Sequence, residues 1–204
     1  KGLSDQTIYN YHKGMKVLLR RAHLFGKIER KKKEKLKGHF KRGDKENVEY
    51  LTENEMQAIM NLELTDDSML SKSRDLFVFQ MWTGLAYSDA QAFDMKQYKN
   101  VDGKWINIGE RIKTGAPYVS VLLPPVVNVL RKYDWKTPQI ENHVYNRMLK
   151  AIGEMAGIGT KLHSHLARHS FATYMLSKGI RIEHVSKMLG HTTIKHTQRY
   201  AKVL

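Results

Sequence analysis

The sequence predicts a mainly α-helical fold that carries a small antiparallel β-sheet. Most apolar residues recur at spacings of three and four, the period of amphipathic helices. One internal stretch, 97–124, instead has short apolar runs between turn dipeptides, as β-hairpins do. At 204 residues, with 41% hydrophobic residues, the chain is long enough to bury a sizeable core. We therefore expect one main domain of ordinary size with a smaller helical piece before it.

The first predicted helix begins at a cap on Ser4 and ends near Gly26. Its apolar side chains follow the helical period at Ile8, Tyr11, Met15, Leu18, Leu19 and Ala22. A dense basic stretch follows, which we interpret as a linker: Lys31, Lys32, Lys33, Lys35, Lys37, Lys41 and Arg42. A charge run of this kind is either a solvated face or a segment that lies along DNA phosphates, and both readings stay open. We predict two domains, 1–42 and 43–204.

The main domain is predicted to open with a capped helix. Thr52-Glu53-Asn54-Glu55 has the form of a capping box before the apolar positions of that helix. The next segment, 74–82, is apolar on every side and is expected to be a buried helix that stops near Gly84.

The turn dipeptides Asp102-Gly103 and Thr114-Gly115 divide the predicted sheet. Each dipeptide is followed by an apolar run, 105–108 and 118–122, and we expect these runs to be strands of the sheet. After Pro125 the helical period returns in five segments: 126–133, 139–156, 165–177, 181–189 and 192–203.

The charge of the chain points to a polyanionic partner. Lys and Arg number 35 against 20 Asp and Glu, a formal net charge of +15. Nucleic acid is the leading partner, although a generically basic protein or an anionic membrane surface would have the same composition. The absence of cysteine excludes disulfides and cysteine-based metal sites and fits a reducing cytoplasm. The sequence has no apolar run long enough to cross a bilayer, and its polar N-terminus does not resemble a leader sequence. We therefore expect a cytoplasmic, nucleoid-associated bacterial protein.

Four polar residues near the C-terminus form a chemical pattern. His165 and Arg168 are three residues apart and share one face of a predicted helix. Arg168 offers planar donors for phosphate oxygens, and His165 can move a proton near neutral pH. His191 follows Gly190 at a predicted helix start, where backbone amides favour an anion. Tyr200 comes next, on the last predicted helix.

A tyrosine is a poor nucleophile at neutral pH because its ordinary pKa is about 10. It needs a proton acceptor and cationic neighbours, which the two histidines and Arg168 can supply. The structural alternative is a helical domain in which the histidines only cap helices or bind carbonyl groups, and Tyr200 only packs.

These residues resemble the motif of the tyrosine recombinase (phage integrase) family: an arginine, a hairpin lysine, His-x-x-Arg, a further His or Trp, and the tyrosine. Thr83-Gly84-Leu85 is similar to the family's Thr-Gly-Leu-Arg box, and Lys113 lies beside the turn between two predicted strands. The remaining places are filled by His165, Arg168, His191 and Tyr200. The resemblance implies a recombinase catalytic-domain fold, preceded by the C-terminal part of a helical core-binding domain.

One position departs from the family pattern. Where the family has its first arginine, this chain has Ala86, in a Thr-Gly-Leu-Ala-Tyr sequence similar to integrases of Bacteroides-type mobile elements. Arg111 lies two residues before Lys113, so on a continuing strand both would face the same side. We hypothesise that Arg111 supplies the missing guanidinium, against the alternative of a surface residue.

The resemblance implies that Tyr200 attacks a DNA phosphodiester and forms a 3′-phosphotyrosyl link, which a second DNA strand then resolves. Lys113 would protonate the leaving oxygen, His165 would act as general acid or base, and His191 would donate to the phosphate. Asp89 would support this set or simply cap a helix. The chemistry implies no cofactor and no metal. Implied partners are double-stranded DNA, three further protomers in a tetramer on DNA, and accessory DNA-bending proteins.

Three other readings are open. A type IB topoisomerase-like enzyme shares the phosphotyrosine chemistry, but the short chain and the integrase-like boxes disfavour it. A DNA-binding protein that has lost catalysis is suggested by Ala86. A helix-turn-helix regulator fits the helices near Ile182 and Thr192 but leaves the other motif residues without a purpose.

Overall fold

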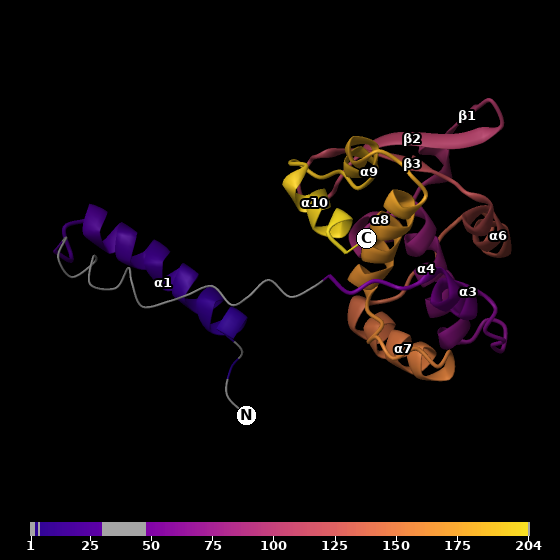
Figure 1. The fold of residues 1–204 in the computed structure, drawn as a ribbon, viewed down its shortest axis with the longest axis horizontal. Coiled ribbons are helices and arrows are strands. Elements are labelled where there is room, and N and C mark those ends of the chain that lie inside the picture. The colour runs from indigo at the N-terminus through magenta and orange to yellow at the C-terminus, as the bar shows by residue number, and fades with distance from the viewer. Residues whose placement is uncertain (1–2, 4, 30–47, 204) are drawn as a thin grey trace. The chain divides into compact units, whose positions relative to one another are not determined.

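A computed structural model of the chain describes residues 3, 5–29 and 48–203 (Figure 1). The chain divides into two compact units, Lys1–Asn47 and Val48–Leu204. The described part of the first unit is dominated by one helix, α1 (Asp5–Leu24), in the place where the sequence predicts it. The predicted cap Ser4 lies outside the described residues, and so do the basic residues Lys31, Lys32, Lys33, Lys35, Lys37, Lys41 and Arg42.

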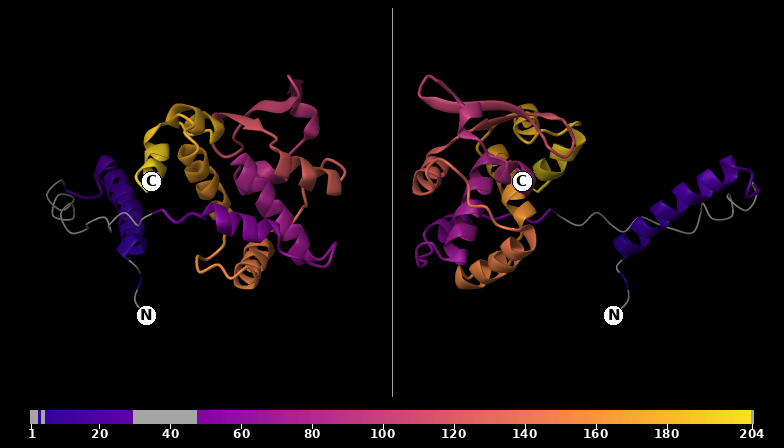
Figure 2. Two further views of the ribbon diagram at one scale, coloured as in Figure 1. Left: turned by 45° about the vertical axis from the view of Figure 1, so that its right-hand side comes forward. Right: turned by 180° about the vertical axis from the view of Figure 1, so that it is seen from behind.

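The second unit is mainly helical and carries one small antiparallel sheet, as the sequence predicts, and this sheet has three strands. In chain order its elements are α3 (Glu53–Met60), α4 (Met69–Thr83), α5 (Tyr87–Gln91), η1 (Met95–Gln97), β1 (Lys99–Val101), β2 (Lys104–Glu110), β3 (Pro117–Val121), α6 (Pro124–Lys132), α7 (Asn142–Met155), α8 (Ser164–Ser177), α9 (Ile182–Met188) and α10 (Lys195–Ala201). Helix α4 is central and packs against α3, α6, α7 and α8 (Figures 1 and 2).

Helix α4 occupies the centre because its sequence is apolar around most of its circumference. Leu76, Phe77, Phe79 and Met81 are all fully buried. The helix ends at Gly84, whose backbone is left-handed (φ 70) and which leaves room for a neighbouring ring. A Cβ at this position would lie 2.5 Å from Phe171 Cδ1, so only glycine fits here without a shift of α8.

The capping box at the start of α3 forms as predicted. The Thr52 side chain accepts from the Glu55 backbone N–H at 3.3 Å, and the Glu55 carboxylate accepts from the Thr52 backbone N–H at 2.8 Å. Two backbone donors at the helix start are thereby satisfied by side chains.

The sheet is an antiparallel meander in the order β1-β2-β3. Val101 pairs with Lys104 across a two-residue turn in which Asp102 (φ 50) and Gly103 (φ 78) both have positive φ, as a type I′ turn requires. Ile106 pairs with Val121 and Glu110 with Pro117. Strand β2 therefore ends before Arg111, and residues 111–116 form the connection to β3.

The last three helices enclose a second, smaller core. Helix α10 packs against α8 and α9, and α9 packs beside β3. Their shared core contains Phe171, Val185, Leu189 and Tyr200. The predicted helix 192–203 is shorter than expected, because residues 191–194 form an irregular turn before α10 begins without a side-chain cap.

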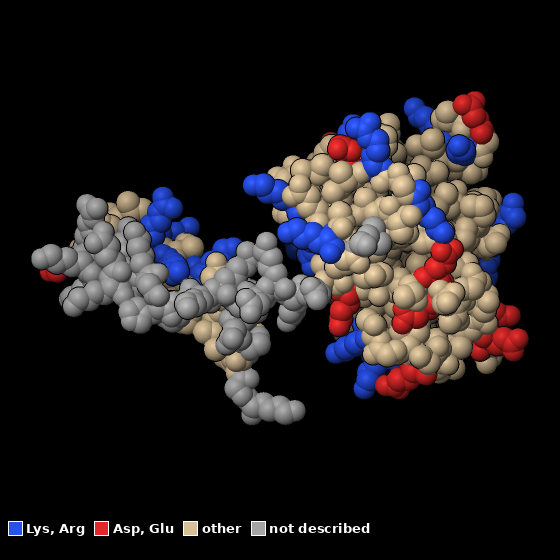
Figure 3. Space-filling model, viewed as in Figure 1, with Lys and Arg blue, Asp and Glu red and all other residues tan. Residues whose placement is uncertain are grey.

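None of the helices in the described residues is long and apolar enough to cross a membrane. Charged side chains are unevenly spread over the second unit. On the face shown in Figure 3, most acidic side chains lie over the half that contains α3 and α7, whereas basic side chains are spread more widely and include a group over α9 and α10.

Candidate active site

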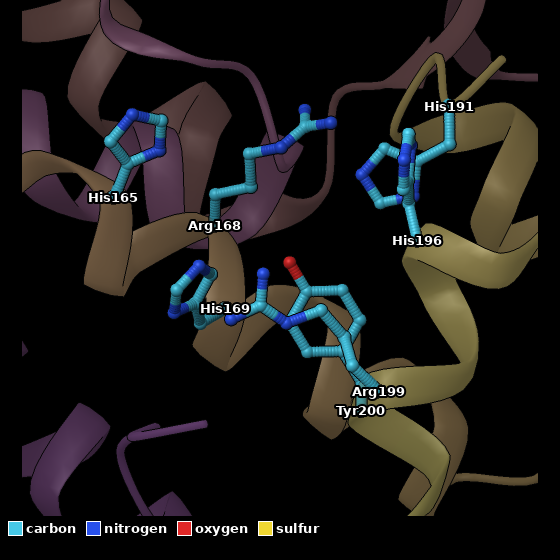
Figure 4. Close-up of a pocket in the computed structure, with 7 residues that line it drawn as sticks. All are labelled: His165, Arg168, His169, His191, His196, Arg199 and Tyr200. Carbon is cyan, nitrogen blue, oxygen red and sulfur yellow. The ribbon is translucent and has the colours of Figure 1, made fainter. Parts of the chain in front are cut away.

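Seven side chains from α8, the α9–α10 loop and α10 line one hollow of about 440 Å³ (Figure 4). They are His165, Arg168, His169, His191, His196, Arg199 and Tyr200. Four of the six catalytic residues predicted from the sequence are in this set. The fold brings them together because α10 packs against α8.

Tyr200 lines the hollow and is only 3% exposed. Its hydroxyl points into the space between Arg168 and the histidines of the α9–α10 loop and α10 (Figure 4). The His169 ring lies 5.5 Å from the tyrosine ring, and the His191 ring stacks on it at 6.4 Å with an interplanar angle of 12°. Burial raises the pKa of Tyr200, while the charges of Arg168 and Arg199 act in the opposite direction. The phenol therefore stays protonated at rest, beside cations that would stabilise phenolate.

Arg168 is 6% exposed and is fixed by two backbone carbonyl groups. It donates to the Gly84 carbonyl at 2.7 Å and also to the Leu189 carbonyl. Burial, followed by the charge of Arg111, lowers its pKa. A guanidinium nevertheless keeps its proton in proteins, so Arg168 holds a positive charge against the hollow.

Arg111 lies beside this group. Its Nε forms an ion pair with the buried carboxylate of Asp89, and its Nη1 donates to the Leu189 carbonyl at 2.8 Å. Asp89 also accepts from the Ile112 backbone N–H at 3.0 Å. The expected strand alternation is wrong, because β2 ends at Glu110 and Arg111 stands in the connection. Arg111 does not line the hollow, but it donates to the same Leu189 carbonyl as Arg168, which does.

Gly190 provides the space for Arg111. Its φ is +59, and a Cβ at this position would lie 2.7 Å from Arg111 Cγ and 3.1 Å from the Tyr118 Cβ. In three consecutive residues, Leu189 therefore supplies the carbonyl that Arg111 and Arg168 share, Gly190 leaves space for the Arg111 side chain, and His191 lines the hollow.

Burial and neighbouring cations favour the neutral form of three pocket histidines, His165, His169 and His191. Burial, with Arg168 next in importance, lowers the pKa of His191 to about 3. Burial followed by the charge of Arg199 lowers the pKa of His169 to about 4. Desolvation also lowers the pKa of His165, with smaller contributions from Arg168, His163, Lys113 and Arg111. A neutral imidazole can accept a proton from a nearby phenol, which an imidazolium cannot.

The structure corrects the expected setting of His191. It is not at a helix start, because α10 begins only at Lys195. Its Nδ1 instead lies 2.8 Å from the hydroxyl oxygen of the buried Thr197.

Besides Arg111, the positions Lys113, Ala86 and Asp89 also lie outside the hollow. Lys113 is exposed in the connection between β2 and β3, and its charge is among those that lower the pKa of His165. Ala86 is buried at the N-cap position of α5. Asp89 is in the first turn of α5, not at its cap, and its carboxylate faces Arg111.

Sequence reasoning missed three residues that line the hollow: His169, His196 and Arg199. His169 is four residues after His165, and His196 is four before Tyr200, so both share a helix face with a predicted site residue. Arg199 lies over the Tyr200 ring at 5.6 Å. Helical spacing would have identified the two histidines, whereas the position of Arg199 depends on how its side chain folds back.

A family model described as the phage integrase family matches residues 49–204. The chain belongs to the phage integrase family. Among curated relatives, a tyrosine recombinase of Thermosipho africanus is 26% identical over 169 residues, which cover 76% of this chain and 57% of that protein. The tyrosine recombinase XerC of Rickettsia prowazekii is 26% identical over 215 residues, covering 99% and 68%. The chain thus spans little more than half the length of the Thermosipho relative.

Solved structures share the fold of this integrase-family chain. The Tn1549 transposon integrase in complex with transposon right end DNA has a TM-score of 0.72 at 16% identity, covering 98% of this chain and 75% of that one. The XerH recombinase in a post-cleavage complex with difH DNA has a TM-score of 0.66 at 18% identity, covering 82% and 54%. The tyrosine recombinase catalytic-domain fold predicted from the sequence is therefore confirmed.

Proposed function

We propose that this chain is the catalytic part of a site-specific DNA recombinase that cuts and rejoins strands through a 3′-phosphotyrosyl intermediate. The observation that carries the proposal is the position of the Tyr200 hydroxyl, which shares one hollow with the fixed guanidinium of Arg168 and several neutral histidines. Cations of this kind stabilise the charge that develops on a phosphate under attack.

In the proposed reaction, the Tyr200 oxygen attacks the phosphorus of a DNA phosphodiester. The bond between that oxygen and phosphorus forms as the bond from phosphorus to the 5′-oxygen breaks. The phenol proton passes to a neutral histidine, for which His165 and His169 are the candidates, and the leaving 5′-oxygen takes a proton from Lys113. The reverse sequence, with a 5′-hydroxyl from another strand, reseals the DNA, so the bond energy is kept in the covalent intermediate.

Arg168 and Arg111 together form the proposed phosphate clamp. The shared Leu189 carbonyl holds both guanidinium groups side by side, and Asp89 orients Arg111. Arg111 would thereby replace the arginine that Ala86 removes. Support comes from the buried ion pair between Arg111 and Asp89, because an arginine that only covered the surface of a strand would not need a buried carboxylate partner.

The remaining parts of the proposal concern the whole protein. Residues 1–42 would be the end of a core-binding domain with its basic linker, and 43–204 the catalytic domain. Double-stranded DNA is the proposed partner, with assembly into a tetramer on DNA and help from accessory DNA-bending proteins. The Thr-Gly-Leu-Ala-Tyr sequence favours an integrase of a mobile element of the Bacteroides type. The similarity to a transposon integrase supports a mobile element in general and does not bear on its type.

The proposal is tested by trapping the covalent intermediate on DNA. The chain is incubated with a pool of nicked suicide duplexes whose sequence is randomised around the nick, and adducts are recovered under denaturing conditions and sequenced. We expect the parent to form adducts on a restricted set of sequences and Tyr200→Phe to form none. The matched control is Tyr174→Phe on α8, a half-buried tyrosine that does not line the hollow, which should form adducts like the parent. An adduct that persists in Tyr200→Phe, or its absence from the parent when DNA is bound, would contradict the proposal.

A further inference from the structure

Thr197 makes a contact in the hollow that the motif residues do not explain. It lies on α10, one turn before Tyr200, and is fully buried. Its hydroxyl oxygen is 2.8 Å from His191 Nδ1. A hydrogen bond at this position fixes the ring of His191, and its direction decides which ring nitrogen carries the proton.

The surroundings of the hydroxyl indicate that Thr197 is the donor. Buried hydroxyl groups on neighbouring helices donate to the carbonyl four residues earlier: Thr83 to Phe79 at 2.7 Å and Ser170 to Leu166 at 2.8 Å. The equivalent carbonyl for Thr197 belongs to Thr193, which precedes α10 and accepts from the His196 N–H. Among the described residues, His191 Nδ1 is the one hydrogen-bond partner of this hydroxyl. Because a buried donor needs an acceptor, its proton is directed at Nδ1.

A neutral imidazole carries a single proton. With Nδ1 acting as acceptor, that proton is on Nε2. Nε2 is the ring nitrogen of His191 that remains available to a ligand in the hollow. The low pKa of His191, caused first by burial and then by Arg168, keeps the ring neutral, so the choice of tautomer has a chemical consequence.

We propose that Thr197 is a positioning residue that holds His191 in its Nε2–H tautomer, so that His191 presents a hydrogen-bond donor to a non-bridging oxygen of the phosphate. The role of His191 in phosphate binding rests on the proposed function, whereas the contact between Thr197 and His191 does not depend on it. The Nε2–H tautomer also excludes His191 as the proton acceptor for Tyr200, because His191 Nε2 has no free lone pair in this form.

The tautomer is measured first, on the full chain without DNA. In a long-range proton–nitrogen correlation spectrum of ¹⁵N-histidine-labelled protein at neutral pH, we expect His191 to show a protonated Nε2 and an unprotonated Nδ1. Its signals are assigned by their loss in His191→Gln. Thr197→Val keeps the side-chain shape but lacks the hydroxyl and should lose the single tautomer, whereas Thr197→Ser should retain it. A protonated Nδ1 in the parent, or an unchanged pattern in Thr197→Val, would overturn the proposal.

The second measurement is the rate of adduct formation on the sequences recovered from the randomised pool. Since removing a whole transition-state donor costs about 100- to 1000-fold, we expect Thr197→Val, which only misdirects one, to lose on the order of 10-fold. Thr197→Ser should stay close to the parent rate, and melting temperatures identify any variant that fails to fold. Equal rates for Thr197→Val and the parent would refute the positioning role. If the parent itself forms no adduct, the proposed function fails, while the spectra still decide the role of Thr197.

Discussion

Arg111 combines a structural and a proposed chemical role in one side chain. Its partner Asp89 is buried, so removal of the guanidinium leaves an uncompensated carboxylate as well as an incomplete phosphate clamp. The two effects must be separated before Arg111 can be assigned to the reaction.

We predict that Arg111→Ala slows adduct formation by about 100-fold or more, the usual cost of one transition-state donor, and also lowers thermal stability. The double variant Asp89→Ala/Arg111→Ala should regain much of the stability, because the unpaired carboxylate is gone, but not the rate. Arg131→Ala, at an exposed arginine of α6, is the matched control. Parent-like cleavage by Arg111→Ala would show that the guanidinium missing at Ala86 is not replaced from this position.

The pocket histidines predict a pH dependence of stability. In the unfolded chain a histidine binds its proton below about pH 6.5, whereas the folded pKa is about 4 for His169 and about 3 for His191. Between these values the unfolded state binds more protons, so the free energy of unfolding should fall as pH is lowered from 6.5 towards 4. Denaturant titrations at several pH values measure this slope.

Replacement of one pocket histidine should reduce that slope. His191→Gln removes a group that, between pH 6.5 and 4, binds a proton only in the unfolded chain. His143→Gln removes an exposed histidine from α7 as a control. An identical slope in His191→Gln and the parent would mean that folding does not lower the pKa of His191.

At the scale of elements, the long helices are predictable from sequence and the short loops at the site are not. Helix α4 has a clear apolar pattern and a glycine stop, and α3 has a complete capping box, so both follow from local rules. Helix α10 has no side-chain cap, so its first turn was misplaced and with it the setting of His191. The contact of Arg111 with Asp89 depends on packing between separate segments, which no local pattern encodes.

The loop between α9 and α10 gives a prediction at this scale. Gly190 and Gly179 both have positive φ, but a Cβ on Gly179 meets no atom within 4 Å, whereas one on Gly190 meets the Arg111 side chain. Both alanine variants should lose about 1–2 kcal/mol of stability through the left-handed backbone. Gly190→Ala should in addition slow adduct formation, because it displaces Arg111. Chemical denaturation and adduct kinetics test the pair, and equal rates in the two variants would contradict the proposed link between Gly190 and the clamp.

At the scale of the whole molecule, the two units differ in what they contribute. Both hydrophobic cores that enclose the site are built from residues within 48–203. The basic stretch precedes them in the chain and supplies positive charge.

We therefore predict that the fragment 48–204 unfolds cooperatively at a temperature within a few degrees of the full chain. Its affinity for DNA should be lower and less dependent on salt, since fewer phosphate contacts release fewer counterions. The full chain with Lys31, Lys32, Lys33, Lys35, Lys41 and Arg42 changed to Gln separates the loss of charge from the loss of α1. A fragment that is unfolded alone would show that the first unit is part of the fold of the second.

The Leu189 carbonyl has a consequence for how phosphate binding would affect the stability of the fold. It holds two guanidinium groups together, yet it has no net charge, and Asp89 neutralises only one of them. The two guanidinium groups therefore repel each other, and a phosphate bound beside them would relieve this repulsion. Thermal stability and phosphate binding would then be thermodynamically linked, so inorganic phosphate alone should raise the melting temperature.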